Sequence, residues 1–232
     1  MRDRLEVLKD LSVENQTKMV LLVMDGLGGL PGVGGQTELE AAATPNLNAL
    51  AARSETGLLE MVDRGITPGS GPGHLGLFGY DPLRFQIGRG ILEALGVGAE
   101  VRVGEVCARG NLCTWGEGDL VLDRRAGRID TISSARIIGR LAEEIREIDG
   151  FGVKFYPGIE HRFAVVFSGD GLCDKVSDAD PQIEGQPMVW SEPLEPSAER
   201  TARLVNDLIR KVRGVLSDEL RANGCLLRGL SG

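Results

Sequence analysis

The feature that most constrains the fold is a continuous apolar run, Met19–Met24 (MVLLVM), which ends at Asp25-Gly26. A short run of this kind between turn residues is typical of a strand buried on both faces, as in a parallel sheet. The next segment, residues 26–35, contains six glycines and one proline and is expected to be a loop. Thr44-Pro45 then predicts a helix through about Ala52, because threonine can cap a helix and proline suits its first position.

Further patterns in the first region extend this interpretation. Residues 1–17 predict a short helix, and residues 58–62 predict a second strand. Residues 67–74 form a glycine- and proline-rich turn, and residues 75–80 predict a short helix after it. The order strand, helix, strand, turn, helix indicates an α/β fold built on a parallel sheet.

From about Val97 the pattern changes to that of a separate α+β domain. Strands are predicted by the alternating residues 101–108 and by the apolar runs 120–122 and 163–167. Amphipathic spacing predicts helices over 137–148 and 200–220. Residues 226–232 look like the start of another element.

Composition excludes several classes of protein. Hydrophobic residues make up 42% of the 232 residues and charged residues 26%, which is ordinary for a globular protein. The net charge of −8 and the lack of a basic stripe argue against nucleic-acid binding. There is no apolar run that could span a bilayer and no secretory signal, so we expect a cytoplasmic protein that is not bound to a membrane. The four cysteines form no C-x-x-C pair and are expected to be buried free thiols: Cys107, Cys113, Cys173 and Cys225.

Two residues of the first region could carry out chemistry. Asp25 follows the expected strand, where ligands of open α/β sheets bind, so it is either a metal ligand or a turn residue that caps the next element. Ser70 is flanked by glycines and precedes a helix, so it is either a phosphate-carrying nucleophile or a plain N-cap. A serine hydroxyl needs activation, and only His74 and His161 are present, with no evident histidine–aspartate relay. Activation by a metal ion is therefore the more natural route.

The second region offers arginines and two loop acids. Arginine suits carboxylates and phosphates, so arginines beside turns of an acidic protein indicate an anion pocket, although each could be ordinary surface charge. The two loop acids could supply a general base, or could be ordinary loop residues. The candidates are Arg109, Arg124, Arg125, Arg128, Arg162 and Arg228, with Asp178 and Asp180 as the acids.

Taken together, these motifs resemble a known family. Three of them stand in the order of the alkaline phosphatase superfamily: Asp25-Gly26-Leu27-Gly28, Thr44-Pro45-Asn46-Leu47, and Pro68-Gly69-Ser70 with Gly73-His74-Leu75. The others are similar to the archaeal-type branch of the 2,3-bisphosphoglycerate-independent phosphoglycerate mutases: Gly79–Pro82, Gly88–Gly90, Glu93–Gly96, Asp123–Arg128, Glu160–Arg162 and Ser177–Pro181. The resemblance runs from Met19 to Gly232.

The resemblance implies an α/β fold: an alkaline-phosphatase-like parallel sheet, incomplete here, with an inserted α+β substrate domain. Residues 1–96 would be the first part of the phosphatase-type domain, 97–225 the inserted domain and 226–232 the start of the return. It implies two divalent metal ions, with Mn²⁺ favoured over Zn²⁺, Co²⁺ or Mg²⁺, and no 2,3-bisphosphoglycerate.

The resemblance also implies the chemistry and its residues. Asp25 and Ser70 would bind metal, and Ser70 would be the catalytic nucleophile that carries the phosphoryl group between 3-phosphoglycerate and 2-phosphoglycerate. The partner would be this small-molecule substrate, and the oligomeric state stays open. The implied substrate-binding residues are Arg109, Arg125, His161, Arg162, Asp178, Asp180 and Arg228.

The sequence departs from this family in two ways. Gly71 stands where an acidic residue usually follows the nucleophile. The chain also ends at about the point where the phosphatase-type domain should resume, so we expect either a fragment or a natural truncation. Two other functions stay open: a metal-dependent phosphatase or phosphodiesterase of the same superfamily, and a non-catalytic anion-binding fragment.

Overall fold

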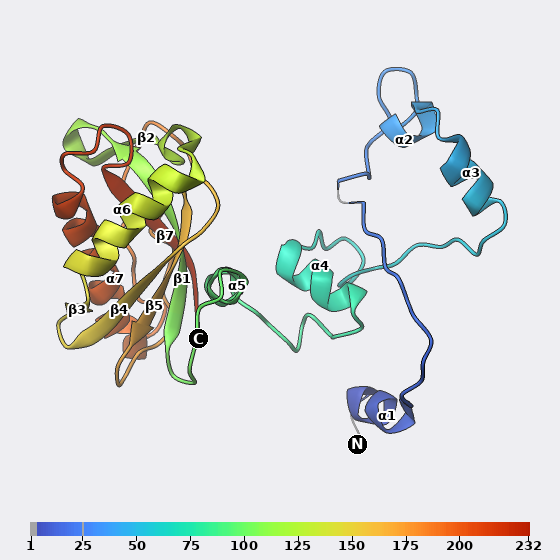
Figure 1. The fold of residues 1–232 in the computed structure, drawn as a ribbon, viewed down its shortest axis with the longest axis horizontal. Helices are drawn as coiled ribbons and strands as arrows, with labels where there is room; N and C mark the ends of the chain where they lie inside the picture. Colours follow the sequence, from blue (N-terminus) through green and yellow to red (C-terminus); the bar gives the residue numbers. More distant parts are fainter. Residues whose placement is uncertain (1–3, 25) are drawn as a thin grey trace.

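The computed structural model describes residues 4–24 and 26–232, and its strands form one seven-stranded antiparallel sheet (Figure 1). The strand order is β3-β4-β5-β1-β2-β6, and β7 also pairs with β1. Every strand comes from the second region of the chain. The strands are β1 (Val106–Trp115), β2 (Leu120–Asp123), β3 (Glu147–Ile148), β4 (Phe151–Pro157), β5 (Arg162–Ser168), β6 (Gln186–Pro187) and β7 (Gly224–Ser231).

Helices of two kinds accompany the sheet. Those that pack on it are α5 (Arg89–Gly96), α6 (Thr131–Glu144) and α7 (Glu199–Val215). Those that precede it lie along an extended arm (Figure 1): α1 (Arg4–Leu11), α2 (Glu38–Ala41), α3 (Pro45–Ala51) and α4 (Ser70–Leu77). Short 3₁₀ turns occupy Glu117–Asp119, Ala126–Arg128 and Pro196–Ala198. No helix in the described part of the chain is both long enough and apolar enough to cross a membrane.

The two faces of the sheet are covered differently. Helices α6 and α7 bury their apolar stripes on one face, where the side chains of Phe163, Val165 and Phe167 form the main core with them. The alternate residues of β5, Ala164 and Val166, point to the other face and pack against α5 in a smaller cluster. Strand β5 is therefore buried on both sides. Because α5 is short, it covers only part of this face of the sheet.

The amphipathic spacing predicted α7 well. The side chains expected on its apolar face are all buried: Leu204, Val205, Leu208, Ile209, Val212 and Leu216. Its observed end, at Val215, comes earlier than the predicted residue 220. Helix α6 begins earlier than the apolar pattern suggested, because the Asp130 side chain accepts a hydrogen bond from the Ser133 amide and caps it.

Other element predictions had mixed outcomes. The strands predicted over 120–122 and 163–167 are confirmed as β2 and β5, and the helix from Thr44-Pro45 is confirmed as α3. The strand predicted over 101–108 begins only at Val106, and the helix predicted over 75–80 begins at Ser70 and ends at Leu77. Residues 226–232, expected to start a new element, form most of β7.

The predicted parallel sheet is not formed within this chain. Residues 19–24 and 58–62 are not strands, and the described residues before Val106 contain no strand at all. The side chains of the apolar run are exposed, with Met19 at 98% and Val20 at 89%. A buried parallel strand needs neighbouring strands for its backbone and helices over both faces. No described segment of this chain supplies these strands and helices. Residues 19–24 therefore do not form a strand, although their sequence pattern is typical of one.

Helix α5 approaches the sheet through a glycine. A Cβ atom on Gly90 would collide with the carbonyl oxygens of Cys107 on β1 and Gly229 on β7. The Ile91 amide donates a hydrogen bond to Ser231 Oγ at 3.0 Å, which satisfies one of the helix's unpaired first-turn groups. The absent side chain and this bond together bring α5 against β1 and β7.

We expect Gly90→Ala to lower the free energy of unfolding by about 1–3 kcal/mol, because the added methyl group must push α5 from the sheet. The matched control is Gly96→Ala at the other end of α5, where a Cβ would meet nothing within 4 Å. That change should be neutral or stabilising by up to about 1 kcal/mol. Urea unfolding of both variants checks this, and equal effects would contradict the close approach.

Candidate functional site

Strand register gathers polar side chains on the face of the sheet that carries α5. Arg109 and Asn111 lie two residues apart on β1, so their side chains share a face. Arg109 is opposite Arg228 on β7, and Asn111 is opposite Arg162 on β5. Residues that are directly opposite in an antiparallel pair point to the same side. Three neighbouring strands therefore bring three arginines and one asparagine together.

These side chains line a cavity of about 280 Å³, which we call the arginine cavity. Six arginines and one acidic residue surround it, in a chain whose net charge is −8. The lining residues are Arg109, Asn111, Arg124, Arg125, Arg128, Glu160, His161, Arg162 and Arg228. A concave surface with this excess of guanidinium groups favours anions, and phosphates and carboxylates above all.

The turn 124–128 supplies half of the arginines from a constrained backbone. Asp123 accepts hydrogen bonds from the backbone amides of Arg125 and Gly127, both at 2.7 Å. Residues 126–128 all have positive φ angles, of 48°, 65° and 52°. Such angles are unfavourable for residues other than glycine and persist only where surrounding bonds hold them. The Asp123 carboxylate thus fixes the turn that presents Arg124, Arg125 and Arg128.

Asp180 is a buried anchor for the same turn. Arg124 donates to it from Nε to Oδ1 at 2.8 Å and from Nη2 to Oδ2 at 2.6 Å, and the Gln182 amide donates at 2.9 Å. Arg228 Nη1 lies 3.9 Å from Oδ2. Burial by itself would raise the pKa of Asp180, but the hydrogen bonds from Arg124 and Gln182 outweigh it and the pKa is lowered. Asp180 is therefore held as a carboxylate.

The neighbouring acid, Asp178, fixes the backbone of β7. Its Oδ1 accepts a hydrogen bond from the Gly229 amide at 2.7 Å. Between the two acids, the Ala179 amide donates to the Leu227 carbonyl oxygen at 2.8 Å. Neither Asp178 nor Asp180 lines the arginine cavity, although both were substrate-binding candidates. Their contacts in this structure are with the groups that surround the cavity.

Burial and mutual repulsion lower the pKa values of two arginines at the centre of the cavity, Arg109 and Arg228. Burial lowers the pKa of Arg109, as do Arg228 and Arg162, and the nearby Glu93 carboxylate opposes this. Burial likewise lowers the pKa of Arg228, with Asp180 opposing it and Arg124 adding to it. The Nε atoms of Arg109 and Arg228 are buried without a hydrogen-bond partner among the described residues. A bound anion would raise the pKa values of both arginines and could accept hydrogen bonds from their Nε atoms.

His161 lies in this cavity as a neutral imidazole. Burial lowers its pKa to about 4, and the positive charges of Arg162, Arg125 and Arg109 add to the shift against the opposing Glu160. Its Nδ1 is 3.7 Å from Glu160 Oε2, which is beyond hydrogen-bonding distance. At neutral pH, His161 therefore offers one donor and one acceptor rather than a charge.

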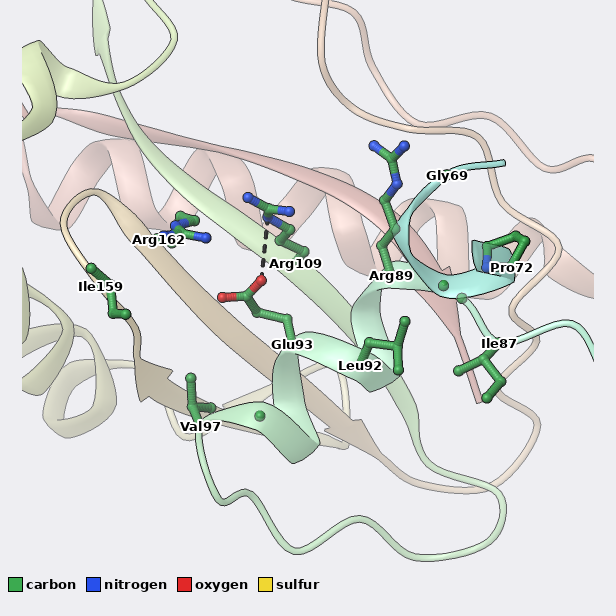
Figure 2. A pocket seen from close by; sticks show the side chains of 13 residues that line it. Gly69, Pro72, Ile87, Arg89, Leu92, Glu93, Val97, Arg109, Ile159 and Arg162 are labelled. Atoms are coloured by element: carbon green, nitrogen blue, oxygen red, sulfur yellow. Dashed lines mark ion pairs between the residues drawn. The ribbon is translucent and has the colours of Figure 1, made fainter. Parts of the chain in front are cut away.

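A larger cavity of about 790 Å³ adjoins the arginine cavity (Figure 2). Arg109 and Arg162 line both cavities. Its other walls are the turn at Gly69, Gly71 and Pro72 and the segment from Ile87 to Val97. Figure 2 shows Glu93 of α5 reaching Arg109, with Nε and Oε2 3.4 Å apart. The turn that begins α4 at Ser70 thus faces the same space as two cavity arginines.

Two of the predicted site residues cannot be placed in full. Asp25 and the side chain of Ser70 lie outside the part that the structure describes, so their predicted metal binding stays a prediction. Among the residues that are described, no group of three or more His, Cys, Asp or Glu side chains could hold a metal ion. The cysteines also form no such site: Cys107, Cys113 and Cys225 are buried free thiols as predicted, and Cys173 is half-buried.

The structure brings together seven candidates and adds residues that the sequence interpretation missed. The candidates that line the arginine cavity are Arg109, Arg124, Arg125, Arg128, His161, Arg162 and Arg228. The missed lining residues are Arg89 and Glu93 of the larger cavity and Asn111 and Glu160 of the arginine cavity. The two-residue spacing from Arg109 could have indicated Asn111, since both lie on one strand. Glu93 opens one of the family motifs, Glu93–Gly96, but its contact with Arg109 depends on how α5 docks.

The chain is a mixed α/β protein with a cavity lined by arginines, and comparison with known proteins gives its family. The profile of the 2,3-bisphosphoglycerate-independent phosphoglycerate mutases matches residues 51–220, and the chain belongs to this family. Proteins named as probable members are similar over essentially the whole chain: 56% identical in Thermotoga maritima over 231 residues, and 53% in Thermus thermophilus over 230 residues. The chain spans 57% of the length of each of these relatives.

Solved structures agree with this assignment. The cofactor-independent phosphoglycerate mutase of Thermoplasma acidophilum is 36% identical, with a TM-score of 0.58 over 90% of this chain and 58% of that one. A Pyrococcus horikoshii protein is 23% identical, with a TM-score of 0.65 over 89% of this chain and 49% of its own. At that identity the second likeness concerns the fold alone.

We expect Asp180→Asn to destabilise the protein by about 3 kcal/mol at pH 7, because it removes one partner of a buried ion pair. Asp178→Asn is the matched control from the same loop. An asparagine oxygen can still accept from the Gly229 amide, so the effect there should stay below about 1 kcal/mol.

The pH dependence gives a second check. The pKa of Asp180 is lower in the folded chain than the value of about 3.9 in an unfolded one. Its stabilisation is therefore present above that value and is lost as pH falls through the folded-state pKa. The difference in the free energy of unfolding between wild type and Asp180→Asn, measured by chemical denaturation, should narrow below about pH 4. A gap that stays constant between pH 7 and pH 3 would contradict the ion pair.

Proposed function

We propose that this chain provides the phosphoryl-accepting serine and the substrate-binding arginines of a phosphoglycerate mutase. The reaction interconverts 3-phosphoglycerate and 2-phosphoglycerate without 2,3-bisphosphoglycerate. Ser70 takes the phosphoryl group, glycerate stays bound and reorients, and its other hydroxyl accepts the group back. Family membership supports this reaction, and the chain's 57% share of its relatives' length makes the activity a proposal for the whole protein.

One observation carries the proposal: the turn at Ser70 and the arginines Arg109 and Arg162 share a cavity. A mutase must hold glycerate beside the phosphoserine until the second transfer. Arginines within the same cavity could bind the carboxylate and the phosphate of the substrate at a fixed distance from the nucleophile. They would also neutralise charge on the transferring phosphoryl group.

The same cavity offers a means of limiting hydrolysis. Its walls include the apolar side chains of Ile87, Leu92, Val97 and Ile159 (Figure 2). Apolar walls around the phosphoserine would exclude water from it. Without that exclusion the enzyme would release phosphate and act as a phosphatase.

Activation of Ser70 is assigned by resemblance to two divalent metal ions, Mn²⁺ in the first instance, with Asp25 as a ligand. The described residues do not form a metal centre by themselves. We expect the 232-residue chain alone to lack mutase activity. The proposed location is the cytoplasm, where phosphoglycerate is available.

Two alternative functions differ from the mutase in what the site would bind and release. A phosphatase or phosphodiesterase of the same superfamily would not need a dense arginine cavity for a carboxylate. A non-catalytic fragment would bind anions through the arginines and transfer nothing. Measuring interconversion of phosphoglycerates against release of phosphate, with and without Mn²⁺, separates the three.

We expect Ser70→Ala to reduce interconversion by more than about a thousandfold, because alanine offers no substitute for the nucleophile. The assay combines this chain with the remaining part of the Thermotoga maritima relative and supplies Mn²⁺. The control is Ser217→Ala, at an exposed serine after α7, which should keep wild-type turnover. Residual activity of Ser70→Ala above about a thousandth of wild type would remove Ser70 from its proposed role.

A further inference from the structure

Asn111 is a polar side chain whose bonding is incomplete. It is only 4% exposed and it lines the arginine cavity. Its Nδ2 donates a hydrogen bond to the carbonyl oxygen of Arg124 at 3.4 Å, so the amide cannot be turned over without placing two oxygens together. This orientation leaves Oδ1 buried and without a partner among the described residues.

An unpartnered acceptor on a residue that lines this cavity would discriminate between ligands. The surrounding guanidinium groups are donors only, so they bind the oxygens of phosphates and carboxylates. Those oxygens are acceptors, and one placed against Asn111 Oδ1 would repel it. A hydroxyl group on the ligand could instead donate to Oδ1 and remove the cost of burying it unpaired.

His161 adds to the mixed character of the cavity. Its side chain is also buried, and its Nδ1 has no hydrogen-bond partner in the described part of the chain. As a neutral imidazole it can donate at one ring nitrogen and accept at the other. A ligand that carries only anionic oxygens would leave Asn111, and the accepting nitrogen of His161, unsatisfied.

We propose that Asn111 is a specificity-determining residue whose Oδ1 accepts a hydrogen bond from a hydroxyl of the ligand held by the arginines. The ligand class is a phosphorylated hydroxy acid rather than a bare anion. This inference rests on the proposed function, because 3-phosphoglycerate carries a free hydroxyl at C2 and 2-phosphoglycerate carries one at C3. Asn111 would thus recognise the group that accepts the phosphoryl group in each direction.

The test compares three ligands by calorimetry on the whole chain: 3-phosphoglycerate, the phosphate ester of 3-hydroxypropionate, which lacks the C2 hydroxyl, and inorganic phosphate. Wild type should bind 3-phosphoglycerate at least about tenfold more tightly than the deoxy ester, because the ester leaves a buried acceptor unpaired. In Asn111→Leu, of similar size but without an acceptor, that ratio should fall to about one. As a control, Arg125→Gln should weaken the binding of both esters alike and leave the ratio of their affinities unchanged.

The outcomes separate this inference from the proposed function. If wild type binds both esters tightly and equally, Asn111 is not a specificity residue, while the anion site stands. If the preference survives in Asn111→Leu, another group recognises the hydroxyl and the inference is wrong. If none of the three ligands binds, the arginine site of the proposed function fails and the inference fails with it.

A second measurement covers the case in which Asn111→Leu does not fold. In wild type, the side-chain carbonyl ¹³C resonance of Asn111 should shift on adding 3-phosphoglycerate and stay in place on adding the deoxy ester. Equal shifts with both ligands, or none with either, would overturn the inference.

Discussion

The site depends on the register between β1 and β7, which places Arg109 directly opposite Arg228. Like charges in directly opposite positions of a sheet destabilise it, and here both side chains are largely buried as well. Two carboxylates from outside the sheet offset this cost: Glu93 on α5 and Asp180 in the loop against β7. The remaining positive charge faces the arginine cavity, where a bound anion would offset it.

Much of the site could be predicted from the sequence, because arginines beside turns of an acidic chain are conspicuous. Arg109, Arg162 and Arg228 line one cavity, although only the strand register explains why. The ion pair of Asp180 with Arg124 was not predicted, because it is a tertiary contact that no local pattern carries. The substrate-binding role of Asp180 stays a prediction. The helices with strong amphipathic spacing were also predicted. The apolar run 19–24 was not a strand, because a parallel strand depends on neighbours that this chain does not supply.

The two parts of the chain contribute differently to the proposed chemistry. The sheet domain holds the arginines in fixed positions, through buried hydrogen bonds and close packing of α5. The first region contributes the turn at Ser70, which reaches the larger cavity beside Arg109. The arginines proposed to bind substrate thus lie in the part of the chain with its own core. The chain spans 57% of the length of its relatives, and phosphoryl transfer is proposed for the whole protein.

The proposed binding of phosphoglycerate uses Nε donors in the arginine cavity that have no hydrogen-bond partner among the described residues. The ¹⁵N–¹H spectrum of the arginine Nε groups during titration with 3-phosphoglycerate tests this binding directly. We expect large shifts for Arg109 and Arg228, and little change for Arg124, whose Nε is already bonded to Asp180. Unchanged Arg109 and Arg228 resonances, with shifts confined to surface arginines such as Arg136, would contradict it.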